Sequence, residues 1–170
     1  MLYGEPGTGK TSGIQSIAGY FNLNITIVNL STIQDDNQLI TMFSQIPKRS
    51  VLLLEDIDLI FSKLSKGKKE SNSNDKNNIT FAGLLNALDG ACSSEGLITF
   101  LTTNHIEKLP DSSIRSGRID KKVNISLANK DTIQKMLLFN NIDDNNFLNK
   151  FTYPISPADI QQEIIIHQNP

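Results

Sequence analysis

The chain has few of the features that mark secreted or membrane-spanning proteins. Cys92 is the one cysteine in 170 residues, so no disulfide can form within the chain, and we expect a reducing compartment. No apolar run approaches the roughly 18 residues that a membrane-spanning helix needs, and we expect no signal peptide before Leu2. The sequence therefore predicts a globular chain held together by its apolar core.

Charge and aromatic content argue against nucleic-acid binding. Sixteen basic and eighteen acidic side chains give a formal net charge of −2, without the basic excess typical of proteins that bind nucleic acids or anionic membranes. Tryptophan is absent, although aromatic side chains commonly stack on the bases of single strands. We expect no nucleic-acid partner. A DNA motor or clamp loader stays as the alternative that salt-sensitive DNA binding would support.

Short apolar runs predict the strands of a parallel sheet. They occupy residues 24–29, 51–55, 97–104 and, more weakly, 122–126. Apolar residues at helical spacing lie between these runs. Because strands alternate with helices, the pattern predicts an α/β fold with helices on both faces of the sheet.

Helix boundaries can also be predicted from the sequence. The first helix follows a glycine-rich loop, and the residues expected on its apolar face are Ile14, Ile17, Ala18 and Phe21. A second helix should end at Pro47, and a third should close at Asp89-Gly90. Asp131 is the candidate N-cap of a later helical segment.

The chain divides by composition into two parts and an insertion. We predict a large α/β subdomain over residues 1–128 and the start of a small helical subdomain over residues 129–170. Residues 62–78 carry almost no apolar side chain and predict a surface loop, with a basic docking site as the alternative.

The stretch GEPGTGKTS predicts a phosphate-binding loop. It fits the pattern G-x-x-x-x-G-K-[ST], in which glycines let phosphate oxygens approach backbone N–H groups at the positive end of a helix. Lys10 would contact the outer phosphates, and the Thr11 hydroxyl would ligate Mg²⁺. A glycine turn that only caps a helix is the alternative. The residues expected to bind ATP are Gly4, Glu5, Pro6, Gly7, Thr8, Gly9, Lys10, Thr11 and Ser12.

Polar side chains end the next two predicted strands. Glu55 and Asp56 follow the run VLLL, and twist at a strand end can bring both carboxylates to one phosphate, although strand neighbours normally point apart. One carboxylate would serve the metal and the other the attacking water. Asn104 ends the following strand, where its amide could bind the γ-phosphate or the water. Acids on a strand that enters solvent, and an asparagine in a turn, are the alternatives.

Two further side chains, those of His105 and Cys92, are candidates for chemical roles. His105 has no metal-ligand partner nearby in the sequence, so we expect it to pack in the core or beside the site. Cys92 lies in the turn-like stretch GACSSEG and is expected to be a small apolar residue.

Together these blocks resemble the AAA ATPases. The resemblance implies a P-loop NTPase fold, a three-layer αβα parallel sheet whose first strand is largely missing, since only Leu2 and Tyr3 precede the loop. It implies that Glu55 holds Mg²⁺ and that Asp56 polarises water, in the reverse of the family's usual Asp-Glu order. A chain that starts in this way is expected to be a fragment, an early-start gene product or a partial homologue.

The resemblance also assigns a role to two arginines. Arg115 and Arg118 in RSGR match residues that reach the nucleotide of a neighbouring subunit, which implies a homo-oligomeric ring. Such an arginine is worth roughly 10³–10⁵ in rate in other classes of nucleotide hydrolase. A surface ion pair with Asp111 or Asp120 is the alternative.

Several stretches resemble one mitochondrial subfamily, the BCS-type chaperones of complex III assembly, which move the folded Rieske iron–sulfur protein across the inner membrane. They are LLLEDID, LLNALDG, TTNHIEKL, SGRIDKKV and ISPADIQQEI. The resemblance implies ATP-driven protein translocation or complex assembly with a protein client. It also implies the mitochondrial inner membrane, with attachment only through a missing N-terminal segment; the cytoplasm is the alternative. A truncated module that binds nucleotide without hydrolysing it is the alternative function.

Overall fold

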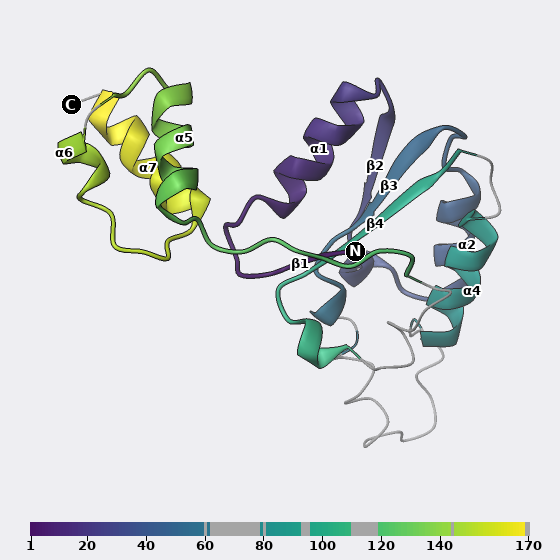
Figure 1. The fold of residues 1–170 in the computed structure, drawn as a ribbon. Coiled ribbons are helices and arrows are strands. Elements are labelled where there is room, and N and C mark those ends of the chain that lie inside the picture. The colour runs from purple at the N-terminus through teal and green to yellow at the C-terminus, as the bar shows by residue number, and fades with distance from the viewer. Residues whose placement is uncertain are drawn as a thin grey trace.

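A computed structural model of the chain describes residues 1–59, 61, 79, 81–92, 96–109, 119–143 and 145–168 (Figure 1). The predicted insertion loop at 62–78 lies outside these residues, as do Arg115 and Arg118. No helix in the described ranges has the length and apolar content that crossing a membrane requires.

Five parallel strands form one sheet in the order β2-β3-β4-β1-β5. They are β1 (Leu2–Tyr3), β2 (Asn24–Val28), β3 (Ser50–Leu54), β4 (Ile98–Thr103) and β5 (Val123–Asn124). β1 lies between β4 and β5, with Leu2 paired to both Thr102 and Val123. The strands lie where the sequence predicts them, and the short first strand takes an inner position.

Helices cover both faces of this sheet (Figure 1). Helix α1 (Lys10–Tyr20) lies on one face, while α2 (Asp36–Ser44) and α4 (Phe81–Cys92) lie on the other. The short 3-10 helices η1 (Leu30–Thr32) and η2 (Ile106–Lys108) also belong to this part of the chain. The predicted three-layer αβα arrangement is confirmed.

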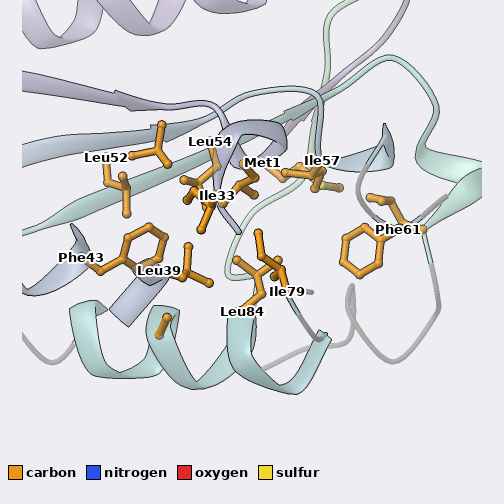
Figure 2. Packing of buried hydrophobic residues seen from close by; sticks show 14 residues of the cluster. Met1, Ile33, Leu39, Phe43, Leu52, Leu54, Ile57, Phe61, Ile79 and Leu84 are labelled. Atoms are coloured by element: carbon orange, nitrogen blue, oxygen red, sulfur yellow. The ribbon is translucent and has the colours of Figure 1, made fainter. Parts of the chain in front are cut away.

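Successive side chains of β3 point to opposite faces of the sheet and belong to two hydrophobic cores. Leu52 and Leu54 point toward α2 and α4, where Figure 2 shows them above Leu39, Phe43 and Leu84. The intervening Val51 and Leu53 pack on the other face with Ile14 and Ala18 of α1. Each fully buried aliphatic side chain of this kind contributes roughly 1.5–3 kcal/mol. β3 is therefore anchored on both faces up to the residue before Glu55.

Two predictions about helices differ from the structure. Ile14 and Ala18 are buried as predicted, where they pack with Val51 and Leu53 of β3, but Ile17 and Phe21 are 39% and 62% exposed. Helix α4 continues through Asp89-Gly90 to Cys92, so Cys92 lies in a helix and not in a turn. The left-handed glycine that follows the helix is Gly96, with a φ of +81°.

The helices α5 (Lys130–Phe139), α6 (Asn145–Leu148) and α7 (Pro157–Gln168) form a hydrophobic cluster of their own. All its buried members lie between Ala128 and Ile164, and Figure 1 shows the three helices set apart from the sheet. The predicted N-cap Asp131 is wrong, because the Asn129 side chain accepts the hydrogen bond from the Thr132 N–H at 2.9 Å. We propose the subdomain boundary at 128/129, directly after Ala128, the first member of this separate cluster.

Candidate functional site

The loop between β1 and α1 has a backbone that suits anion binding. Gly7 and Gly9 have φ values of +74° and +90°, a left-handed region that residues with a Cβ adopt only at a cost. Gly9 is the N-cap of α1, and no side chain caps the helix there. The first N–H groups of α1 are therefore free of a side-chain cap at the end of the helix that favours negative charge.

Lys10 reaches back over this loop. Its Nζ donates hydrogen bonds of 2.9 Å to the carbonyl oxygens of Gly4 and Glu5, and the side chain is buried. Burial lowers the pKa of Lys10, while the carboxylates of Asp56, Glu5 and Asp58 oppose that shift. The loop therefore holds a partly desolvated cation, which a phosphate group would stabilise.

Thr11 and Glu55 meet where the first turn of α1 faces the end of β3. The Thr11 hydroxyl donates to Oε1 of Glu55 at 2.6 Å. In the part of the chain that the structure describes, no three His, Cys, Asp or Glu side chains gather as metal ligands. Mg²⁺ is commonly held by one or two carboxylates together with oxygens of the substrate and water. This hydroxyl and carboxylate are oxygen donors of the kind that Mg²⁺ requires.

Asp56 and Asn104 meet across the ends of the neighbouring strands β3 and β4. Asn104 Nδ2 lies 3.5 Å from Asp56 Oδ1. Asp56 has a left-handed φ of +50°, a conformation that aspartate tolerates better than most residues. Glu55 and Asp56 both line the same cavity. The sequence suggested that twist at the strand end brings the two carboxylates together, and the structure adds a left-handed backbone at Asp56.

These groups surround one cavity of about 540 Å³, within the range of roughly 300–1,000 Å³ usual for ligand sites. Its lining comprises Pro6, Gly7, Gly9, Lys10, Thr11, Ser12, Glu55, Asp56, Thr102, Asn104, Pro157, Ala158 and Gln161. The last three come from the start of α7, and the Ala158 N–H donates to the Gly7 carbonyl at 3.1 Å. Helix α7 therefore supplies one wall of the cavity.

Most of the predicted loop residues line this cavity, and the others support it. Gly4 and Glu5 hold Lys10 through their carbonyls, and the Thr8 hydroxyl donates to the Glu5 carbonyl at 2.9 Å. Arg115 and Arg118 lie outside the described residues, so their expected role stays a prediction.

The structure corrects one sequence prediction and adds residues that the sequence did not point to. The expectation that His105 packs in the core is wrong: its side chain is 48% exposed, and its Nδ1 lies 2.8 Å from Glu107, an arrangement typical of a surface pair. The sequence did not predict that Gln161 and its neighbours in α7 line the cavity. Their one local signal is Ser156 before Pro157, the pattern of a helix start, and it indicates nothing about a distant loop.

Comparisons with known proteins show which family the chain resembles. A sequence profile of the "ATPase family associated with various cellular activities (AAA)" matches residues 1–127. The chain is 45% identical over 153 residues to the probable mitochondrial chaperone BCS1-A of Dictyostelium discoideum, covering 87% of this chain and 36% of the relative. It is 36% identical over 184 residues to the mitochondrial chaperone BCS1 of Bos taurus, covering 99% of this chain and 43% of that protein.

Similarity to a solved structure supports the fold. The crystal structure of the FIGL-1 AAA domain in complex with ADP superposes with a TM-score of 0.68 at 23% identity, covering 95% of this chain and 56% of that one. The chain spans less than half the length of the two chaperone relatives described above. The AAA-type fold and the likeness to BCS-type chaperones, both expected from the sequence, are confirmed.

Proposed function

Because the chain belongs to the AAA family of ATPases, we propose that it binds ATP with Mg²⁺ and hydrolyses it. One observation carries this proposal: the cation and hydroxyl of Lys10 and Thr11 face Glu55, Asp56 and Asn104 across a single cavity. A phosphate-binding loop opposite carboxylate and amide groups is the arrangement that hydrolysis of a triphosphate requires.

The loop and α1 would bind the phosphates. Lys10 would exchange its hydrogen bonds to the Gly4 and Glu5 carbonyls for the outer phosphate oxygens, and the uncapped N–H groups of α1 would contact the same anion. Thr11 and Glu55 would hold Mg²⁺, which neutralises charge on the transferred phosphoryl group when bound. The positive φ of Gly7 and Gly9 keeps the loop backbone in this conformation.

Asp56 and Asn104 would act on the attacking water. Asp56 would accept a proton from the water while the water oxygen forms a bond to the γ-phosphorus. The bond between the γ-phosphorus and the ADP oxygen breaks at the same time, which gives ADP and phosphate. Asn104 would direct its amide at Asp56 and at the γ-phosphate. The 3.5 Å separation is long for a hydrogen bond, and such contacts often tighten only when substrate is bound.

We further propose that the site is completed by a second subunit. Within the described residues the cavity is lined by Lys10 but by no arginine. Arg115 and Arg118 of a neighbouring copy would supply the guanidinium groups in a homo-oligomeric ring. A single subunit would then hydrolyse ATP poorly, and activity per subunit would rise with assembly.

The biological setting is proposed from the relatives. The similarity to proteins named as mitochondrial chaperones favours a chaperone-type function in the mitochondrion. We propose that the chain acts there on a protein client, by translocation or complex assembly, at the inner membrane. A complex III client and attachment through a segment outside this chain belong to the same proposal. The cytoplasm is the alternative location.

The test is phosphate release from Mg²⁺-ATP over a range of concentrations of the chain. We expect activity per subunit to rise with concentration and to vanish in Lys10→Ala, while the exposed-lysine control Lys135→Ala keeps it. Arg115→Ala subunits mixed into wild type should lower activity by more than dilution with Lys135→Ala subunits does. ATP binding without phosphate release would support the non-hydrolysing alternative, and absence of ATP binding would overturn the proposal.

A further inference from the structure

We infer that Asp58 and Thr103 are a positioning pair that sets Asn104 against Asp56; this rests on the proposed hydrolysis of ATP. The Thr103 hydroxyl donates to Asp58 Oδ1 at 2.7 Å. Thr103 is 0% and Asp58 3% exposed, and neither lines the cavity. A carboxylate buried in this way is costly unless it is hydrogen-bonded, so this contact is expected to be well maintained.

The same hydroxyl holds the backbone on the far side of Asn104. Thr103 Oγ1 accepts a hydrogen bond from the His105 N–H at 3.0 Å. Asn104 therefore lies between Thr103 and His105, which are hydrogen-bonded to each other through the Thr103 hydroxyl. The turn after β4 is held by a side chain, and the direction of the Asn104 amide follows from that turn.

The residues that follow β3 are held in place by core packing. Asp56 and Asp58 flank Ile57, which is 3% exposed and belongs to the core beneath the sheet, as Figure 2 shows. The ends of β3 and β4 are thus joined by an inner contact through Asp58 and an outer contact through Asp56.

The inner contact is the stronger of the two. It is short, charge-assisted and shielded from water, whereas the outer contact spans 3.5 Å at the cavity surface. Asp58 and Thr103 therefore set the spacing between the ends of β3 and β4. This spacing in turn determines how far Asn104 lies from Asp56. The pair acts on hydrolysis through these two residues and does not touch the phosphates.

The test removes the hydroxyl while keeping the side-chain shape. Thr103→Val should lower kcat for ATP by roughly tenfold to a hundredfold, the usual effect of losing a partner that orients a site residue. The KM should change little, because the loop from Gly4 to Ser12 is untouched. Thr103→Ser, which restores the hydroxyl, should recover most of kcat. Thr26→Val in β2 is the matched control and should leave both constants unchanged.

The outcomes separate this inference from the proposed function. Wild-type chain that binds ATP without releasing phosphate overturns the proposed function, and this inference with it. An active wild type with unchanged kcat in folded Thr103→Val overturns the inference alone, as does a loss of kcat that Thr103→Ser does not recover. If Thr103→Val fails to fold, Asp58→Asn decides, since it keeps the acceptor oxygen without the charge: a lowered kcat with an unchanged KM supports the pair, whereas an unchanged kcat, or a raised KM that marks an effect on Lys10, overturns it.

Discussion

The Thr11 hydroxyl donates a 2.6 Å hydrogen bond to Oε1 of Glu55, across 44 positions of sequence. The contact joins the first turn of α1 to the end of β3 and places both oxygens at the edge of one cavity. The two residues are far apart in sequence, and they meet because the parallel sheet brings the start of α1 next to the end of β3.

Removing either partner of this contact should change the response to Mg²⁺. In Thr11→Val and in Glu55→Gln, the Mg²⁺ concentration needed for half-maximal ATP binding should rise by about tenfold or more, because an oxygen ligand or its charge is lost. A fluorescent ATP analogue titrated with Mg²⁺ measures this. Thr41→Val, at an exposed threonine of α2, is the control. Unchanged Mg²⁺ dependence in both site variants would contradict the metal assignment.

Lys10→Met should remove the stabilisation of the fold by nucleotide. For the wild type, Mg²⁺-ATP at about 100 times its Kd should add about 2.7 kcal/mol to the free energy of unfolding, since ligand binds only the native state. The variant loses the cation that faces the phosphates, so its unfolding should become nearly independent of ATP. Thermal unfolding with and without ATP measures the difference, with Lys135→Ala as control. A variant that ATP stabilises as strongly as it does wild type would exclude a phosphate role for Lys10.

The buried ammonium should also make stability depend on pH. Burial lowers the pKa of Lys10 below its ordinary value of 10.5. At pH values between the lowered pKa and 10.5, the unfolded chain therefore keeps a proton that the native protein has released. The free energy of unfolding then rises with pH within this window. Wild type should therefore gain stability relative to Lys10→Met as the pH is raised from neutral toward 10.5. Denaturant midpoints of the two proteins measure this; a constant difference across the range would contradict the lowered pKa.

Two glycines in the first part of the chain should respond in opposite ways to alanine. Gly7→Ala places a Cβ at a φ of +74°, where it would lie 3.0 Å from Ser156 Oγ and 3.2 Å from Ala158 Cβ. We expect a loss of roughly 1–2 kcal/mol from the backbone alone, together with weaker ATP binding. Gly13→Ala in α1 meets no atom within 4 Å and should gain about 0.5–1 kcal/mol. Equal stabilities by denaturant unfolding would mean that the loop conformation does not require Gly7.

The proposed boundary at 128/129 can be tested through α7. Ile160→Ala removes a side chain that is 0% exposed in the C-terminal cluster and should cost roughly 2–5 kcal/mol locally. Amide exchange should accelerate in α5 and α7 while β3 keeps its protection. Ile165→Ala, in the same helix but 54% exposed, is the control and should change exchange little. Equal acceleration in β3 would show that the chain unfolds as one unit.

The local order of the chain could be predicted from residues close together in sequence. A buried strand requires a short apolar run, and a phosphate loop requires glycines followed by a lysine and a hydroxyl, so β3, β4 and the loop before α1 were found where expected. Errors arose where neighbouring residues compete. Asn129 and Asp131 are both good N-caps, and the extended backbone falls at Asn129. Gly90 can end a helix, yet here it lies within one.

By itself the sequence determined the loop and the strand-end acids of the proposed ATP site, because both are short-range patterns with few other uses. Only the tertiary structure decided that Ala158 and Gln161 form a wall of the cavity, that Thr103 holds Asp58, and that His105 lies exposed beside Glu107. Those contacts depend on how the sheet stacks its strands and where α7 docks on the loop. That packing is set by the fit of whole elements, which no local pattern of residues encodes.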